Sequence, residues 1–202
     1  MPLSAIAINS TLKRSPADSS CDLLLSQVQA EFVRQGVDCP MIRAVDHDIL
    51  PGITSDEGPG DAWPNLRKQI LAADILILGT PIWMGQPSSV CKRVMERLNA
   101  VLGETDDQGR TLVYGKVAAV AVVGNEDGAH NIVAQLFQGL NDIGYTIPAS
   151  CSTYWVGEAM GSTDYKDLSE TPDAVSSATQ ALVQNCKHLA GLLSKSQYPP
   201  KQ

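Results

Sequence analysis

The amino-acid sequence predicts an α/β protein built around a parallel sheet. Short apolar runs alternate along the chain with stretches whose apolar residues recur at helical spacing, which is typical of strand–helix units. Two runs, 74–79 and 116–123, are apolar along almost their whole length, as expected of strands covered by helices on both faces. The 202 residues suffice for one sizeable core and show no repeat or linker. We therefore expect a single domain over 1–202.

The first strand and helix are expected within the first 36 residues. Residues 4–9 (SAIAIN) have the composition of a short buried strand. A serine, a proline and an acid over 15–18 match a helix start, and Gly36 is a natural stop. Between these two signals, apolar residues repeat at helical spacing at Leu24, Val28 and Phe32.

The second and third strands are separated by a long loop. Residues 37–45 predict a strand, weakened by Pro40, and 47–61 form a loop rich in glycine, proline and acids. A helix over 63–73 leads into the third strand, 74–79.

The second half of the chain continues the alternation. Ser88 can cap a helix over 88–102, whose apolar stripe is Val90, Val94, Leu98 and Val101. The later elements expected are a strand over 116–123, a helix over 129–143, a shorter strand over 145–150 and a final helix over 172–193.

Composition argues against several classes of function. The net charge is −7, from 22 acidic and 15 basic residues, so no nucleic-acid partner is expected. The five cysteines and three histidines are widely spaced, so no metal site is expected. No apolar stretch approaches the length of a membrane span, and the first residues do not resemble a secretion signal. We therefore expect a cytoplasmic protein with reduced thiols.

Ligands of parallel sheets bind beyond the carboxyl ends of the strands, so three loops are of interest. The first, 9–20, carries hydroxyls at Ser10, Thr11, Ser15 and Ser19 and charges at Lys13 and Arg14 ahead of a helix N-terminus, which suits a phosphate. Composition alone is equally compatible with a plain polar loop and its capping serine. The triphosphate-binding GxxxxGK[ST] and the dinucleotide-binding GxGxxG motifs are both missing.

The second and third loops could surround a flat ring. Residues 79–89 combine Trp83 and Met84 with glycines and prolines, a composition suited to lining a ring with backbone amides. Trp83 could pack on that ring or be buried in an oligomer interface. In 124–131 two glycines flank polar residues, which also suits an ordinary turn. No GxSxG or HExxH motif is present, and we predict no catalytic side chain.

These loops resemble those of the NADPH-dependent FMN reductase and flavodoxin-like quinone reductase family. Residues 80–97 (TPIWMGQPSSVCKRVMER) are similar to the family stretch P-x-(aromatic)…S…K…(D/E)R. Ser10 with 14–20 resembles the family's phosphate loop, and 124–128 with Gly144 resembles the region after the fourth strand. The resemblance covers most of 4–150. It implies a flavodoxin-like three-layer sandwich whose five-stranded parallel sheet has the order 2-1-3-4-5.

The resemblance also implies FMN as cofactor, NAD(P)H as co-substrate and a homodimer or homotetramer. Electrons would pass to a quinone, flavin or other small acceptor. The implied FMN-binding residues are Ser10, Leu12, Ser15, Ser19 and Ser20 for the phosphate, Pro81, Ile82, Trp83, Met84 and Gly85 for the ring, and Gly124, Asn125 and Gly128 for the far wall. The phosphate loop departs from the family in having no glycine.

Two alternatives stay open. One is a flavodoxin-type electron carrier without its own NAD(P)H reaction, which the acidic charge favours and the phosphate loop does not. The other is a flavin-less binding module on the same fold, because the fold does not determine the function.

Overall fold

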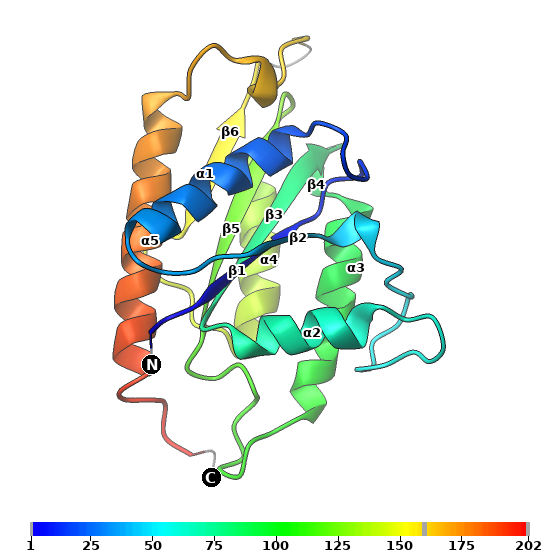
Figure 1. The fold of residues 1–202 in the computed structure, drawn as a ribbon, viewed down its shortest axis with the longest axis vertical. Helices are drawn as coiled ribbons and strands as arrows, with labels where there is room; N and C mark the ends of the chain where they lie inside the picture. Colours follow the sequence, from blue (N-terminus) through cyan, green and yellow to red (C-terminus); the bar gives the residue numbers. More distant parts are fainter. Residues whose placement is uncertain (1, 159–160, 201–202) are drawn as a thin grey trace.

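The computed structural model describes residues 2–158 and 161–200 and contains a parallel five-stranded sheet. Its strands, in spatial order, are β2 (Met41–Arg43), β1 (Ala5–Asn9), β3 (Ile75–Trp83), β5 (Val117–Gly124) and β6 (Ser152–Val156) (Figure 1). A two-residue strand, β4 (Gln86–Pro87), pairs antiparallel with the end of β3. Because β4 adds only this hairpin, the expected order 2-1-3-4-5 of the main strands is confirmed.

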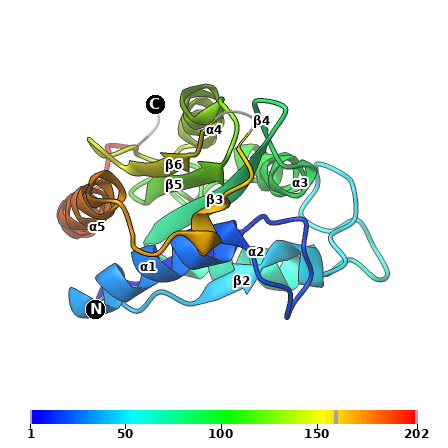
Figure 2. The ribbon, with the colours of Figure 1, turned by 90° about the horizontal axis from the view of Figure 1, so that it is seen from above.

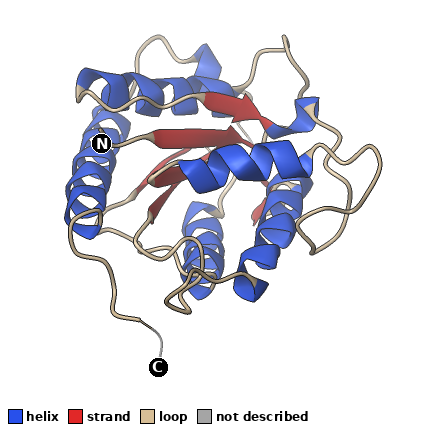
Figure 3. Ribbon diagram, turned by 60° about the horizontal axis from the view of Figure 1, so that its bottom comes forward, coloured by secondary structure: helices blue, strands red, loops and turns tan. Residues whose placement is uncertain are grey.

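Helices cover both faces of the sheet (Figures 2 and 3). On one face lie α1 (Ser20–Arg34) and α5 (Asp173–Leu193), and on the other lie α2 (Trp63–Ala72), α3 (Ser89–Leu98) and α4 (Ala129–Asp142). Each face has its own apolar core, and successive residues of β1, β3 and β5 enter the two cores alternately. Burial on both faces explains why these strands are continuous apolar runs.

The first helix begins later than the sequence predicts. It starts at Ser20 instead of Ser15, because Ser19 has an extended backbone and its hydroxyl accepts from the Asp22 amide at 3.4 Å. The amide and hydroxyl of Ser15 instead donate to Asp46, at 2.9 and 2.6 Å. The predicted stop at Gly36 is confirmed, with a left-handed φ of +78°.

The last strand lies later in the chain than the sequence predicts. Within 145–150 only Thr146 bridges to β5, Pro148 has no amide to donate, and Ser150 has a φ of +52°. The strand that pairs with β5 is Ser152–Val156, whose alternating exposure gives only a weak apolar pattern.

Over the described residues, three short 3₁₀ helices complete the fold: η1 (Ala44–Asp46) after β2, η2 (Asn99–Gly103) after α3 and η3 (Tyr165–Asp167) after β6. The second strand is therefore shorter than predicted, and η2 forms the end of the helix expected over 88–102. The predicted cap of α3 is confirmed, since the Ser88 hydroxyl accepts from the Cys91 amide at 3.0 Å. None of the described helices has both the length and the apolar character needed to cross a membrane.

Candidate functional site

A groove of about 130 Å³ opens at the carboxyl end of the sheet, where the segments that follow β1, β3 and β5 meet. Its polar end is lined by Thr11, Leu12, Lys13, Ser19, Ser20 and Cys21. Its other end is lined by Pro81, Ile82, Trp83, Val123, Gly124 and Asn125, and Asp164 joins them from the segment after β6. Sites for drug-sized ligands usually enclose about 300–1,000 Å³, so a ligand of that size would extend out of the groove.

The turn that leaves β1 is held by a buried asparagine. The Asn9 side-chain nitrogen donates to Asp22 at 2.8 Å, and its oxygen accepts from the Thr11 amide at 3.0 Å. Asp22 also pairs with Arg43 at 2.8 Å, so the acid in the first turn of α1 is neutralised locally. Asn9, which is not among the predicted site residues, therefore positions the loop.

Hydrogen-bond donors gather at the polar end of the groove. Within the described residues, the amides of Leu12, Ser20 and Cys21 have no hydrogen-bond partner. The Ser19 hydroxyl donates to Thr11 Oγ1 at 3.0 Å, which places two hydroxyls beside these amides. The N-terminus of α1 and the Lys13 charge add positive potential. This donor set fits a phosphate group.

Two of the predicted phosphate residues do not line the groove. Ser10 is fully buried beneath it, and its carbonyl accepts from the Ser88 hydroxyl at 2.6 Å, joining the first loop to α3. Its own hydroxyl has no nitrogen or oxygen partner among the described residues. Ser15 is exposed and bonded to Asp46 away from the groove. Leu12, Ser19 and Ser20 do line the groove, together with Thr11 and Lys13.

The second predicted loop is a strand extension followed by a tight turn. β3 continues to Trp83, and the chain reverses into β4 at Met84 and Gly85, whose φ values are +53° and +71°. Positive φ at both central residues is typical of a two-residue type I′ hairpin. The strand ending Pro81–Trp83 lines the groove, whereas Met84, 90% exposed, and Gly85 form the tip.

The hairpin rests on the third loop. A Cβ added at Gly128 would lie 2.6 Å from the Cα of Gly85, so this close approach requires glycine. The Met84 amide donates to Glu126 at 3.0 Å, and the Asn131 side chain donates to the Gly85 carbonyl at 2.9 Å. Gly128 therefore supports the hairpin, while Gly124 and Asn125 line the groove itself.

A segment far along the chain borders the groove from the side of α1. The Asn125 side chain donates to the Gly161 carbonyl at 3.3 Å and to Asp164 at 3.5 Å, and the Lys166 amide donates to Ser20 Oγ at 3.3 Å. Asp164 is not among the predicted site residues, because a single acid in a stretch without a regular pattern carries no signal.

The groove holds no activated nucleophile among its lining residues. Burial raises the pKa of the Cys21 thiol, and the neighbouring Cys91 and Asp22 act in the same direction, so Cys21 is a neutral thiol at neutral pH. Within the described part of the chain, no cluster of three histidine, cysteine or acidic side chains is placed to hold a metal ion. The arrangement can bind a molecule with a phosphate at one end and a flat apolar body at the other.

Comparisons with known proteins agree with this geometry. A family model described as NADPH-dependent FMN reductase matches residues 4–161. The 8-demethyl-8-aminoriboflavin-5′-phosphate synthase of Streptomyces davaonensis is 30% identical over 208 residues, covering 98% of this chain and 81% of that protein. A protein of Mycobacterium bovis named divalent metal cation transporter MntH is 37% identical over 198 residues, which are 95% of this chain but only 29% of that protein.

Solved structures agree with both the fold and the family. The crystal structure of RosB with bound 8-demethyl-8-formylriboflavin-5′-phosphate matches with a TM-score of 0.89 at 30% identity, over 97% of this chain and 82% of that chain. An archaeal flavodoxin matches with a TM-score of 0.55 at 10% identity, over 93% of this chain and 99% of that chain, and this match shows the flavodoxin-like fold alone.

Proposed function

The chain belongs to the NADPH-dependent FMN reductase family, and from this premise we propose that it is an oxidoreductase that binds FMN in the groove and passes electrons from NAD(P)H to a small acceptor. The observation that carries the proposal is the chemical difference between the two ends of one groove. Unpaired backbone amides lie at one end beside the hydroxyls of Thr11 and Ser19, which bond to each other, and an aromatic and aliphatic wall lies at the other.

The polar end would hold the phosphate. The amides of Leu12, Ser20 and Cys21 and the hydroxyl of Thr11 supply donors, and Lys13 supplies charge. The N-terminus of a helix binds a phosphate through its free backbone N–H groups and the positive end of its dipole. This explains how a loop without glycine could serve.

The other end would hold the flavin ring. Pro81, Ile82 and Trp83 form one side, and Gly124 and Asn125 form the other. FMN, when bound, supplies the hydride-accepting chemistry, and the protein binds and orients it. Trp83 is 52% exposed, so one side of the site stays open to a second substrate.

A second function is favoured by one specific observation. The match to RosB, a structure with a modified flavin phosphate bound, has a TM-score of 0.89, against 0.62 for a NADH:FMN oxidoreductase. The same groove could therefore hold a flavin phosphate as the substrate to be modified at its ring. Exchange of a ring methyl for an amino group would need an amine donor and an oxidant. Mass spectrometry of FMN before and after incubation with the protein, an amine donor and oxygen therefore separates these two functions, because a cofactor is recovered unchanged.

The function can be tested with purified protein and FMN. We expect the protein to retain FMN through dialysis, to be yellow and to lose its flavin absorbance rapidly when NADPH is added without oxygen. Retention without bleaching would indicate an electron carrier or a flavin-modifying enzyme. A colourless protein that does not bind added FMN would leave only the flavin-less binding module.

The apolar rim of the groove supports the expected homodimer or homotetramer. Met84, Tyr154 and Val156 are exposed large apolar residues near the carboxyl end of the sheet. A second copy that covered this rim would remove their apolar surface from water. Light scattering during size-exclusion chromatography measures the oligomeric state directly.

A further inference from the structure

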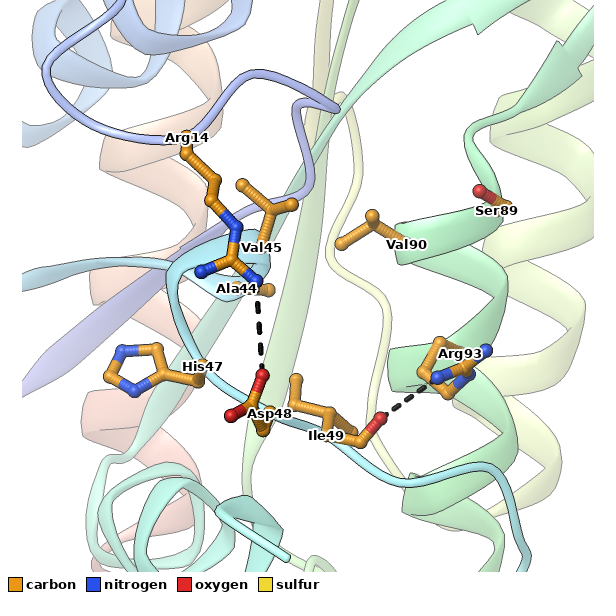
Figure 4. A pocket seen from close by; sticks show the side chains of 9 residues that line it. All are labelled: Arg14, Ala44, Val45, His47, Asp48, Ile49, Ser89, Val90 and Arg93. Atoms are coloured by element: carbon orange, nitrogen blue, oxygen red, sulfur yellow. Dashed lines mark hydrogen bonds and ion pairs between the residues drawn. The ribbon is translucent and has the colours of Figure 1, made fainter.

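Acids that line the cavities of this protein differ in how they are paired. A hollow of about 240 Å³ beside the first loop contains Asp48, which pairs with Arg14 at 3.8 Å (Figure 4). In a hollow at the amino end of the sheet, Asp106 pairs with Arg110 at 2.6 Å. The groove contains an acid of another kind, Asp164, which is not paired with a cation in this way.

The carboxylate of Asp164 is half-buried in the groove wall and weakly bonded. It accepts from the Asn125 side chain over a long distance, 3.5 Å. Lys166, the cation two positions along the chain, pairs with Asp167 at 2.7 Å instead. Asp164 also precedes η3 without capping it through its side chain. An ionised carboxylate offers about four acceptor positions, so most of those on Asp164 stay available to a ligand.

The neighbouring residue, Tyr165, fixes the place of Asp164. The Tyr165 side chain is buried, its hydroxyl donates to Gln27 of α1 at 2.6 Å, and its ring centre lies 5.5 Å from that of Trp155 in β6. The segment is therefore anchored between a helix and the sheet edge. Because this anchor does not involve the Asp164 side chain, the carboxylate is held at the groove before any ligand binds, which lowers the entropic cost of a contact with it.

Asp164 lies between the two ends of the groove. On one side, Asn125 of the ring end donates to the Gly161 carbonyl at 3.3 Å, and on the other the Lys166 amide donates to Ser20 Oγ of the phosphate end at 3.3 Å. A carboxylate repels a phosphate, so an acid at this position suits a part of the ligand that carries hydrogen-bond donors and no negative charge. In FMN that part is the ribityl chain, whose hydroxyl groups lie between the phosphate and the ring.

We propose that Asp164 is a specificity-determining residue that accepts hydrogen bonds from the hydroxyl groups of the chain between the phosphate and the ring. The inference rests on the proposed function, and it applies whether the flavin phosphate is a cofactor or a substrate. The segments after β1, β3 and β5 hold the phosphate and the ring, and the segment after β6 adds recognition of the chain. The groove would thus select flavin phosphates with a hydroxylated chain over those with a plain alkyl chain.

The affinities of two flavin phosphates test this selectivity without any reaction. One is FMN, and the other is a synthetic flavin 10-pentyl phosphate, which has hydrogen in place of every chain hydroxyl. Quenching of flavin fluorescence measures both dissociation constants with the purified full-length protein. We expect FMN to bind about 10-fold more tightly, as expected for one hydrogen bond to a charged group. Equal affinities would overturn the proposal.

Variants then assign the selectivity to Asp164. Asp164→Ala should raise the dissociation constant of FMN about 10-fold and leave that of the pentyl phosphate unchanged. Asp164→Asn keeps the shape and one acceptor oxygen, so it should fold and lose less affinity for FMN. Asp167→Ala is the matched control, because it removes the same charge from an exposed side chain at the other end of η3 and should leave the ratio of the two constants unchanged. A merely structural role of Asp164 would weaken both flavins alike, and that result would overturn the proposal.

Mixing the FMN-loaded proteins with NADPH in the absence of oxygen separates this inference from the proposed function. If NADPH bleaches the flavin but the ratio of dissociation constants is the same in Asp164→Ala as in the parent protein, only the role of Asp164 fails. If the ratio depends on Asp164 but NADPH does not bleach the flavin, only the oxidoreductase function fails. A protein that binds neither flavin would overturn both.

Discussion

Two polar loops at the carboxyl end of the sheet, 10–19 and 47–61, have similar compositions but differ in how many of their polar groups are hydrogen-bonded within the protein. In 47–61 the polar groups bond to one another and to α3. Asp61 alone accepts from the amides of Leu50, Glu57 and Trp63, at 3.2, 3.0 and 3.1 Å, and from Arg97 at 2.6 Å. Arg97 is fully buried and lies 5.8 Å from the centre of the Trp63 ring.

The loop over 10–19 leaves donors unused beside a groove. The Leu12 amide has no partner among the described residues, and neither do the amides of Ser20 and Cys21 at the start of α1. A loop that satisfies its own polar groups supports the fold, whereas a loop that leaves them aimed at a cavity is suited to a ligand. The hydrogen-bond partners of their polar groups therefore distinguish the two loops, whereas their compositions do not.

The largest expected effect on stability comes from removing an ion pair that holds the loop 47–61. Arg97→Met should lower the free energy of unfolding by about 3–5 kcal/mol, because it leaves the Asp61 carboxylate buried without its cation. Urea denaturation followed by circular dichroism measures this change. Arg34→Ala is the control, since Arg34 is exposed and its loss should cost less than about 1 kcal/mol. Equal losses in the two variants would contradict this account of the loop.

The next effect concerns the ligand-binding loop. Ser20→Glu should raise the dissociation constant of FMN about 100-fold, because it places a negative charge at the phosphate end of the groove. An acid at a helix N-terminus is favourable, so the protein should fold normally. Fluorescence quenching of FMN measures the affinity. Ser15→Ala should bind FMN like the parent protein. A loss of FMN binding in this variant would show that Ser15 does contribute to the phosphate site.

Low pH should reduce the stabilising contribution of the loop 47–61, by a smaller amount. Burial by itself would raise the pKa of Asp61, but the amides of Glu57, Trp63 and Leu50, together with Arg97, hold it below its usual value. A lowered folded-state pKa gives stability that is present above the unfolded-state pKa, about 3.9, and lost as the pH falls through the folded-state value. The decline of unfolding free energy below about pH 4 should therefore be shallower in Asp61→Asn than in the parent protein. Identical slopes would show that Asp61 does not contribute.

The smallest expected effect lies at the hairpin tip that borders the groove. Met84→Gly should raise the free energy of unfolding by about 0.5 kcal/mol, because a left-handed backbone costs a non-glycine residue about 1–2 kcal/mol and glycine offsets part of this by its greater unfolded-state entropy. Gly85→Ala, at a φ of +71°, should have the opposite sign. Thermal denaturation compares the two, and a destabilised Met84→Gly protein would show that the exposed Met84 side chain makes a stabilising contact.

Most of the fold could be predicted because its signals are local. The apolar runs of β3 and β5, the stop at Gly36 and the cap at Ser88 each depend on a few adjacent residues, and all were placed correctly within a few positions. The start of α1 and the position of β6 were misplaced, since Ser15 is held by Asp46, 31 residues away, and β6 is defined by its pairing with β5.

For the candidate site, too, some features could be predicted from the sequence and others depend on tertiary contacts. The sequence by itself determined the order of strands and helices and the three segments that meet at the carboxyl edge, because periodicity and capping are properties of neighbouring residues. Only the tertiary structure decided which hydroxyls face the groove, turning Ser20 toward it and burying Ser10. It also brought Asp164 to the groove and set Gly85 against Gly128. These outcomes depend on contacts between segments far apart in the chain, which no local pattern records.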